Sequence, residues 1–101
     1  DFHQAVIPEK FMIHSNYPNP FNGNTQIRLE MPERHTVRVK IYDIRGNLVR
    51  TLHQGTMRAG VHTLEWNARN DQQQQVATGM YLCKVVIDDR LRKVIKMMYV
   101  R

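Results

Sequence analysis

The sequence predicts an all-β protein in which two antiparallel sheets pack face to face, and three observations lead to this class. In residues 25–31, TQIRLEM, apolar residues alternate strictly with polar ones, and residues 36–42, TVRVKIY, repeat the pattern. The five glycines are scattered one to a turn. No segment of ten or more residues carries an apolar stripe at helical spacing. Strands with one packed and one wet face are typical of antiparallel sheets.

The first strands have a clear inward side. Ile27, Leu29 and Met31 share one face of the first alternating run, and Val37, Val39 and Ile41 share one face of the second. The stretch Asp43–Asn47 then offers Gly46 for a left-handed position in a hairpin turn, and another strand follows it.

The later elements complete the pattern. Residues 62–66, HTLEW, place His62, Leu64 and Trp66 on one face, and a buried indole fills the space between two sheets well. Residues 67–79 form the longest polar connection. Tyr81, just after Gly79, stands where a tyrosine corner is expected.

Two long strands end the chain, in residues 79–88 and 92–100, with Asp88 and Asp89 in a tight hairpin between them. Both strands are apolar on parts of both faces, so their inward side stays open. About seven short strands with turns every 8 to 12 residues or so predict an immunoglobulin-like antiparallel β-sandwich.

A chain of 101 residues fits one domain. Residues 1–10, DFHQAVIPEK, contain a proline and no alternation, so we expect a linker or the tail of a preceding domain there, and the domain itself in residues 11–101. No run approaches the roughly 18 apolar residues that span a bilayer, so no stable membrane insertion is expected. Residues 1–20 show no signal peptide, so an export signal would lie upstream.

The formal net charge is +6, but most basic residues stand singly along the strands, as solvated outward faces do. Nucleic-acid binding is therefore not expected. The one cluster of cations lies near the end of the chain and comprises Arg90, Arg92, Lys93 and Lys96. Cys83 is the only cysteine, which excludes an internal disulfide and a cysteine-based metal site. Its apolar neighbours predict a small buried side chain.

The residues of common active sites are missing or badly spaced. The five histidines show no metal-binding spacing, Ser15 is the only serine and lies in no nucleophile-elbow pattern, and no glycine-rich phosphate loop exists. Asn22–Asn24 and Asn70–Asp71 lack the spacing of a calcium loop and are expected to be turn residues. We expect no enzyme, no catalytic residue, no cofactor and no metal.

A run of motifs resembles a known family. The segment FMIHSNYPNPFNGNTQIRLEMP, residues 11–32, resembles the start of type A C-terminal sorting domains of the type IX secretion system. The likeness continues through the Asp-x-x-Gly turn of VRVKIYDIRGNLVRTL, the Gly-x-His-x-x-x-Trp of AGVHTLEWNARN, the Gly-x-Tyr of VATGMYLCKV and the closing basic strand RKVIKMMYVR. Gly23 and Asn24 replace the usual Pro-Ser or Pro-Thr, and a loop glycine is missing after Asp71. The immunoglobulin-like domain of flagellar hook-capping proteins shares several segments and is the nearest rival.

The resemblance implies a non-catalytic sorting domain fused behind a cargo protein. Its expected partners are that upstream cargo and the secretion machinery, and the protein would pass through the periplasm to the cell surface or the medium. We expect the last hairpin, residues 79–101, to be recognised by strand addition and charge complementarity. The residues expected to contact the machinery are Lys93, Lys96, Met97, Met98, Val100 and Arg101.

The other family-motif residues have structural roles under this interpretation. They are Tyr17, Pro18, Asn19, Pro20, Phe21, Asn22, Asp43, Gly46, Gly60, Trp66, Gly79 and Tyr81. In the opening segment, residues 16–22, Tyr17 and Phe21 are expected to fold back as apolar anchors, and the asparagines to bond local backbone groups. Two other functions stay open: a carbohydrate-binding or adhesive module, which needs an exposed aromatic platform, and a flagellar hook-capping role.

Overall fold

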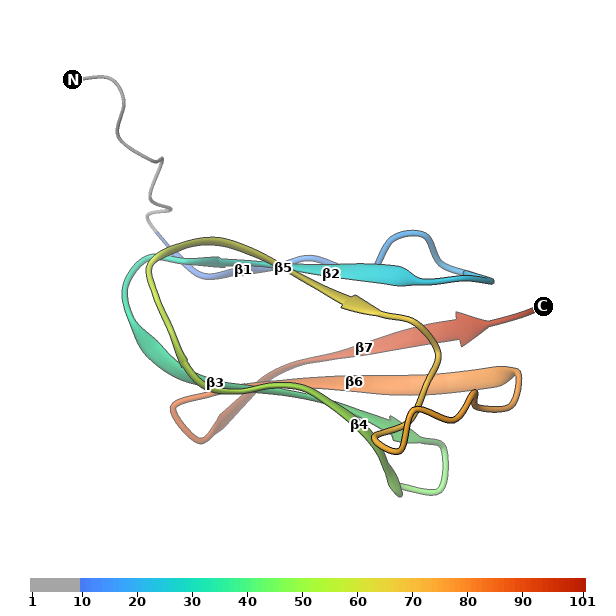
Figure 1. The fold of residues 1–101 in the computed structure, drawn as a ribbon. Coiled ribbons are helices and arrows are strands. Elements are labelled where there is room, and N and C mark those ends of the chain that lie inside the picture. Colours follow the sequence, from blue (N-terminus) through green and yellow to red (C-terminus); the bar gives the residue numbers. More distant parts are fainter. Residues whose placement is uncertain (1–9) are drawn as a thin grey trace.

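The computed structural model describes residues 10–101, which form seven strands and no helix, so no helix in this range could cross a membrane. The strands are β1 (Met12–Ile13), β2 (Thr25–Met31), β3 (His35–Asp43), β4 (Leu48–Met57), β5 (Gly60–Trp66), β6 (Gly79–Ile87) and β7 (Arg90–Tyr99). They lie in two facing layers, which confirms the predicted β-sandwich (Figure 1). Residues 1–9, most of the expected linker, lie outside the described range.

All strand pairs are antiparallel, and the chain moves repeatedly from one sheet to the other. One sheet has three strands in the order β1-β2-β5, and the other has four in the order β4-β3-β6-β7. Figure 1 shows the four-stranded sheet as the lower layer, with β7 running along the molecule to the C-terminus at the right. The last hairpin thus forms one side of the larger sheet, and β7 is its outermost strand.

Alternation along each strand builds the core. The inward residues predicted for β2 and β3 are all buried, which confirms the two clearest faces. For the last two strands the structure settles which side is inward. The buried positions are Tyr81, Cys83, Val85 and Ile87 in β6, and Ile95, Met97 and Tyr99 in β7. Cys83 is buried, as expected, and this burial raises the pKa of its thiol to about 12, because the charged thiolate is disfavoured away from water.

A cluster of packed aromatic side chains closes one end of the core. Trp66 is fully buried, and its ring centroid lies 5.6 Å from that of Phe21 and 5.2 Å from that of Tyr81. The indole N–H donates to the carbonyl of Arg69 at 2.9 Å, so its polar atom is satisfied. The Tyr81 hydroxyl donates to the carbonyl of Ala77, four residues upstream, which is the contact that a tyrosine corner makes.

Two turns hold the hairpins of the larger sheet. Between β3 and β4, the carboxylate of Asp43 accepts the backbone N–H groups of Arg45 and Asn47, while Gly46 has a φ of +91°. These bonds favour the charged carboxylate, led by the one from Asn47, and lower the pKa of Asp43. Between β6 and β7, Asp88 and Asp89 both have positive φ, as a two-residue hairpin loop of type I′ requires.

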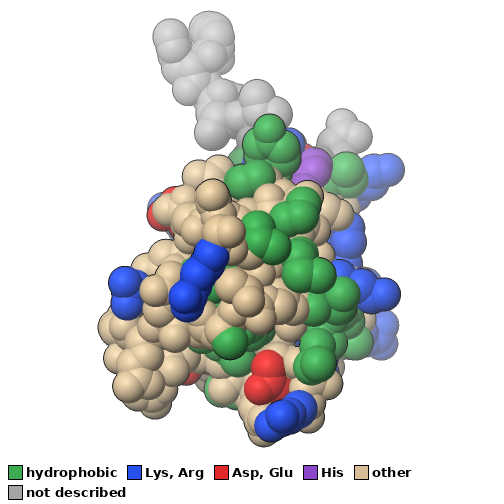
Figure 2. Space-filling model, turned by 90° about the vertical axis from the view of Figure 1, so that its right-hand side faces the viewer, with side chains coloured by type: hydrophobic (Ala, Val, Ile, Leu, Met, Phe, Trp, Pro, Cys, Tyr) green, Lys and Arg blue, Asp and Glu red, His purple; other side chains and the backbone are tan. Residues whose placement is uncertain are grey.

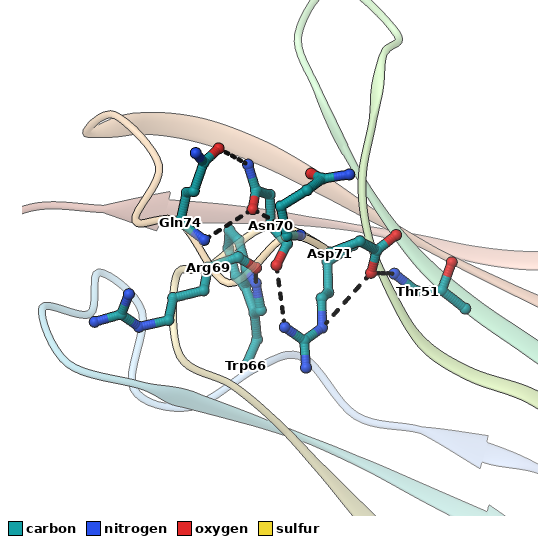
Figure 3. Close-up of polar contacts among 8 residues, drawn as sticks. Thr51, Trp66, Arg69, Asn70, Asp71 and Gln74 are labelled. Carbon is teal, nitrogen blue, oxygen red and sulfur yellow. Dashed lines mark hydrogen bonds and ion pairs between the residues drawn. The ribbon is translucent and has the colours of Figure 1, made fainter.

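The polar connection between β5 and β6 is ordered around Asn70 (Figure 3). The side-chain oxygen of Asn70 accepts the backbone N–H groups of Gln72 and Gln74, and its backbone carbonyl accepts from Arg50. Asp71 accepts the backbone N–H of Thr51, which ties the loop to β4. The Asn70 and Asp71 oxygens therefore make the loop's own hydrogen bonds, as turn residues do.

Candidate interaction surface on the last hairpin

The residues that the sequence proposes for recognition divide between two faces of β7. Lys96, Val100 and Arg101 are exposed, and Met98 is half-buried. Lys96, Met98 and Val100 follow one another at every second position, so they share the outer face of the sheet. Met97 faces the other way and is fully buried. Its side chain belongs to the core, so it is not available to a receptor in the folded domain.

Lys93 has a different position from the other cations. Its side chain is half-buried, and its ammonium group donates to the backbone carbonyl of Ile13 at 2.8 Å. This bond joins β7 to β1 of the opposite sheet, so Lys93 closes the side of the sandwich. Its charge remains at the surface, but its amine has a structural contact that the sequence pattern did not indicate.

The outer face of the hairpin is more apolar than the proposed residues suggest. Val94 pairs with Lys84, and Met98 pairs with Met80, on neighbouring strands. Val94 is 41% exposed, Met80 is 40% exposed and Leu91 is 58% exposed. Figure 2 views the molecule from the end at which β7 finishes and shows hydrophobic side chains in a band down one side, with Lys and Arg side chains beside it. Reasoning from the sequence missed Val94, Met80 and Leu91, because either face of these strands could have been inward.

The end of the chain from residue 90 carries positive charge only. It contains five cations and no carboxylate side chain: Arg90, Arg92, Lys93, Lys96 and Arg101. Within residues 10–101, none of the five forms a salt bridge with an acidic side chain. The guanidinium of Arg92 instead lies 5.4 Å from the ring centre of Phe11. A surface of this charge favours acidic partners and repels basic ones.

The opening segment contacts this same strand. Phe21 is 2% exposed and its ring lies 5.3 Å from that of Tyr99, so it anchors the segment as expected. Its backbone N–H donates to the Met98 carbonyl, and its carbonyl accepts from the Val100 N–H. The expectation that Tyr17 packs as a second anchor is wrong, since Tyr17 is 80% exposed. Tyr17 instead pairs through its backbone with Gln26 of β2, and its ring points away from the core.

The asparagines of the segment act at different ranges. Asn16 is buried and its amide donates locally, to Thr25 and to the carbonyl of Pro18. Asn19 reaches a strand almost 80 residues away: its amide N–H donates to the Lys96 carbonyl at 3.0 Å, and its oxygen accepts the Met98 N–H at 2.9 Å. At about 0.5–1.5 kcal/mol each, these two bonds contribute about 1–3 kcal/mol.

A shallow groove lies on the opposite sheet. It encloses about 320 Å³ and is lined by His14, Ser15, Tyr17, Gln26, Arg28 and Thr63. His14 and Arg28 both contact the carboxylate of Glu30 at the edge of this groove. No cluster of three or more His, Cys, Asp or Glu side chains suited to a metal occurs within residues 10–101.

Comparison with known proteins supports this description of the fold. Solved structures that resemble the chain include dimeric latent PorU from Porphyromonas gingivalis, at 19% identity and a TM-score of 0.69, covering 89% of this chain and 9% of PorU. PorZ, a surface component of the type IX secretion system of the same organism, is 25% identical with a TM-score of 0.56, covering 88% of this chain and 11% of PorZ. FlgD from P. aeruginosa is 17% identical with a TM-score of 0.57, covering 95% of this chain and 76% of FlgD.

The chain thus spans about a tenth of the first two proteins that it resembles. Among curated proteins, comparison finds no significant match. The model of one family, described as the FlgD Ig-like domain, matches residues 15–90, which include the opening motif, Trp66 and all of β6. On this match, the chain belongs to the FlgD Ig-like domain family.

Proposed function

We propose that this chain is a non-catalytic sorting domain that directs a fused cargo protein through the type IX secretion system. The observation that carries the proposal is the last hairpin: β7 is an outermost strand, and residues 90–101 carry five cations, none of which forms a salt bridge within residues 10–101. The motif order of the sequence supports it, as does the similarity to PorZ, a component of that system. Exported in this way, the protein would end at the cell surface or in the medium.

Recognition would need no chemistry in the domain itself. The sandwich already holds the hairpin in one conformation, so little conformational entropy is lost when the hairpin binds a receptor. The cations of β7 steer an acidic receptor surface toward the hairpin, and Met98 and Val100 add apolar contact on the outer face. Since Met97 is buried, this contact does not require the core to open.

The test is export of a reporter. Residues 1–101 are fused to the end of a periplasmic reporter in a bacterium that has the secretion system, and the reporter is measured in medium, surface and periplasmic fractions. The double variant Lys96→Glu/Arg101→Glu should leave the reporter in the periplasm. The matched control Arg34→Glu/Arg58→Glu changes two exposed cations outside residues 79–101 and should be exported normally. Equal export of both variants would contradict recognition through the hairpin.

A carbohydrate-binding module is the second candidate, because one exposed aromatic lies beside a groove. Tyr17 stands at the groove with Gln26, Arg28 and Thr63, which offer hydrogen-bond donors and acceptors next to an aromatic face. Trp66, Tyr81 and Tyr99 are buried and cannot form the broad platform that this function predicts. Calorimetry with a panel of oligosaccharides, comparing the wild type with Tyr17→Ala, tests it. A hook-capping role, which the family also allows, predicts no export of the reporter.

A further inference from the structure

The outer edge of β7 is already occupied at one end by the chain itself. Phe21 and Tyr99 form a parallel bridge, in which the Phe21 N–H donates to the Met98 carbonyl and the Val100 N–H donates to Phe21. In a parallel ladder, one residue bonds the carbonyl before and the N–H after its neighbour on the other strand. Phe21 makes this pair of bonds around Tyr99. The opening segment is therefore a one-residue strand added beside β7.

Asn19 continues the ladder with its side chain. Its amide N–H donates to the Lys96 carbonyl and its oxygen accepts the Met98 N–H, so it bonds the groups on either side of Met97. These are the two bonds that the peptide groups of a parallel strand would make there. A flexible primary amide thus takes the place of a strand residue. Pro20, between Asn19 and Phe21, has no N–H to offer on the solvent side, so the segment does not itself invite another strand.

Among residues 10–101, nothing covers the next part of the edge in this way. By strand alternation, the N–H and carbonyl of Val94 and the N–H of Lys96 point to the same side as the groups that Asn19 binds. Within residues 10–101, β6 is the only one of the seven strands that pairs with β7, and none of the backbone hydrogen bonds outside the sheets reaches Val94. The open edge therefore begins at Val94 and ends at the Lys96 carbonyl, which the Asn19 amide binds.

We propose that the edge of β7 from Val94 to Met98 is the docking site of an extended acidic segment of the partner, and that the Asn19 amide is a latch which this segment displaces. The proposal rests on the proposed function, because it names the partner chemistry of the same hairpin. Charge selects the occupant: residues 90–101 carry five cations and no carboxylate side chain, so a second copy of this strand is repelled and an acidic strand is attracted.

Phe21 limits how far the docked strand extends. Its ring is buried between Trp66 and Tyr99, so the bonds around Tyr99 stay in place when the Asn19 amide leaves. The incoming strand would pair along Val94, Lys96 and Met98 and stop there. Successive side chains of the docked strand would point to opposite faces, so its acidic side chains would lie on the outer face beside Lys96 and its apolar side chains on the inner face.

The experiment uses the 101-residue chain and a synthetic eight-residue peptide in which Glu alternates with Val, blocked at both ends. Amide NMR shifts locate the peptide, and a titration gives its affinity. We expect shifts at Val94, Lys96 and Met98. We expect Asn19→Ala to bind about tenfold tighter, because the peptide no longer competes with the two latch bonds. Lys96→Glu should abolish binding, and the matched variant Arg34→Glu should not change it.

Two control peptides separate strand pairing from plain charge attraction. One carries N-methyl groups on alternate amides, and the other has Lys in place of Glu; neither should bind. The proposal is overturned if the Glu-Val peptide does not bind, if the methylated peptide binds as well, or if Asn19→Ala weakens binding in a folded variant. If the peptide binds but the reporter is not exported, the docking proposal stands and the sorting function is contradicted. If the reporter is exported but the peptide does not bind, the sorting function stands and the docking proposal is contradicted.

Discussion

Replacing Phe21 by Ala tests whether the opening segment holds the sandwich together. The ring is 2% exposed and lies 5.6 Å from Trp66 and 5.3 Å from Tyr99, centre to centre. Truncating a buried phenylalanine costs about 3–5 kcal/mol, from lost burial and from the cavity that remains. A domain of this size has a free energy of unfolding of about 5–15 kcal/mol, so Phe21→Ala removes a large share of it.

Tyr17→Ala is the matched control, since it removes an aromatic from the same motif. Tyr17 is 80% exposed, so its loss should change the free energy of unfolding by no more than about 0.5 kcal/mol. The assay is urea unfolding followed by fluorescence of Trp66, the only tryptophan. With a slope of about 1–2 kcal/mol per molar urea, the midpoint of Phe21→Ala should fall by roughly 2 M or more.

If Phe21→Ala is too unstable to purify, Phe21→Leu gives the same test with a smaller change, of roughly 1–2 kcal/mol. The reasoning is refuted if truncating Phe21 costs less than about 1 kcal/mol, or if the Tyr17 variant is destabilised as much. Either result would mean that burial in the folded domain does not decide which aromatic of the motif is the anchor.

Three further predictions concern other sites. Burial raises the pKa of the Cys83 thiol to about 12, so Cys83 should react with a disulfide reagent at neutral pH only as the chain unfolds. The contribution of the protonated thiol to stability is constant below its usual pKa near 9 and is lost as the pH rises toward 12. Asp88 has its pKa lowered chiefly by the hydrogen bond from His35, so its stabilising effect is full above its usual pKa of 3.8 and is lost as the pH falls through the lower folded value. Asp88→Asn should therefore flatten the acid side of the unfolding profile, measured between pH 7 and about pH 2. Asn70→Ala removes two acceptor bonds in the loop before β6 and should cost about 1–2 kcal/mol in urea unfolding, with faster amide exchange at Gln72 and Gln74.

The fold was predictable where one face of a strand is apolar and the other polar. In β2 and β3 a shift by one residue would expose every buried side chain, so the pattern fixes the inward face. In β6 and β7 it does not, because Val86 and Val94 are apolar and face outward. The sequence therefore predicted these strands but left their inward side open. The short β1 has two residues and no pattern of its own, since it exists through its pairing with β2.

The sequence was enough to predict the hairpin as the candidate surface, but not to predict which of its side chains face outward. Lys96 and Val100 were proposed and are exposed, whereas Met97 and Met98 are adjacent, chemically identical and on opposite faces. The contact of Asn19 with β7 joins residues 77 and 79 positions apart, so no local pattern signals it. For the same reason Tyr17 and Phe21 looked alike: which aromatic enters the core depends on where β7 lies, and not on the motif itself.

Phe21 and Asn19 cover the edge of β7 with different strengths, and this difference explains why only the Asn19 amide would be displaced. Unprotected strand edges promote aggregation, and proteins block them with prolines, charges or covering segments. An edge that a partner must recognise cannot be blocked permanently along its whole length. Here the cover at Tyr99 depends on the buried Phe21 ring, at about 3–5 kcal/mol, and a docking strand has little reason to remove it. The cover at Met97 depends on two exposed hydrogen bonds of the Asn19 side-chain amide, which together contribute about 1–3 kcal/mol. Two equivalent hydrogen bonds from the backbone of a partner strand would replace them. The cations then decide which backbone arrives, because they repel another copy of this chain and attract an acidic strand.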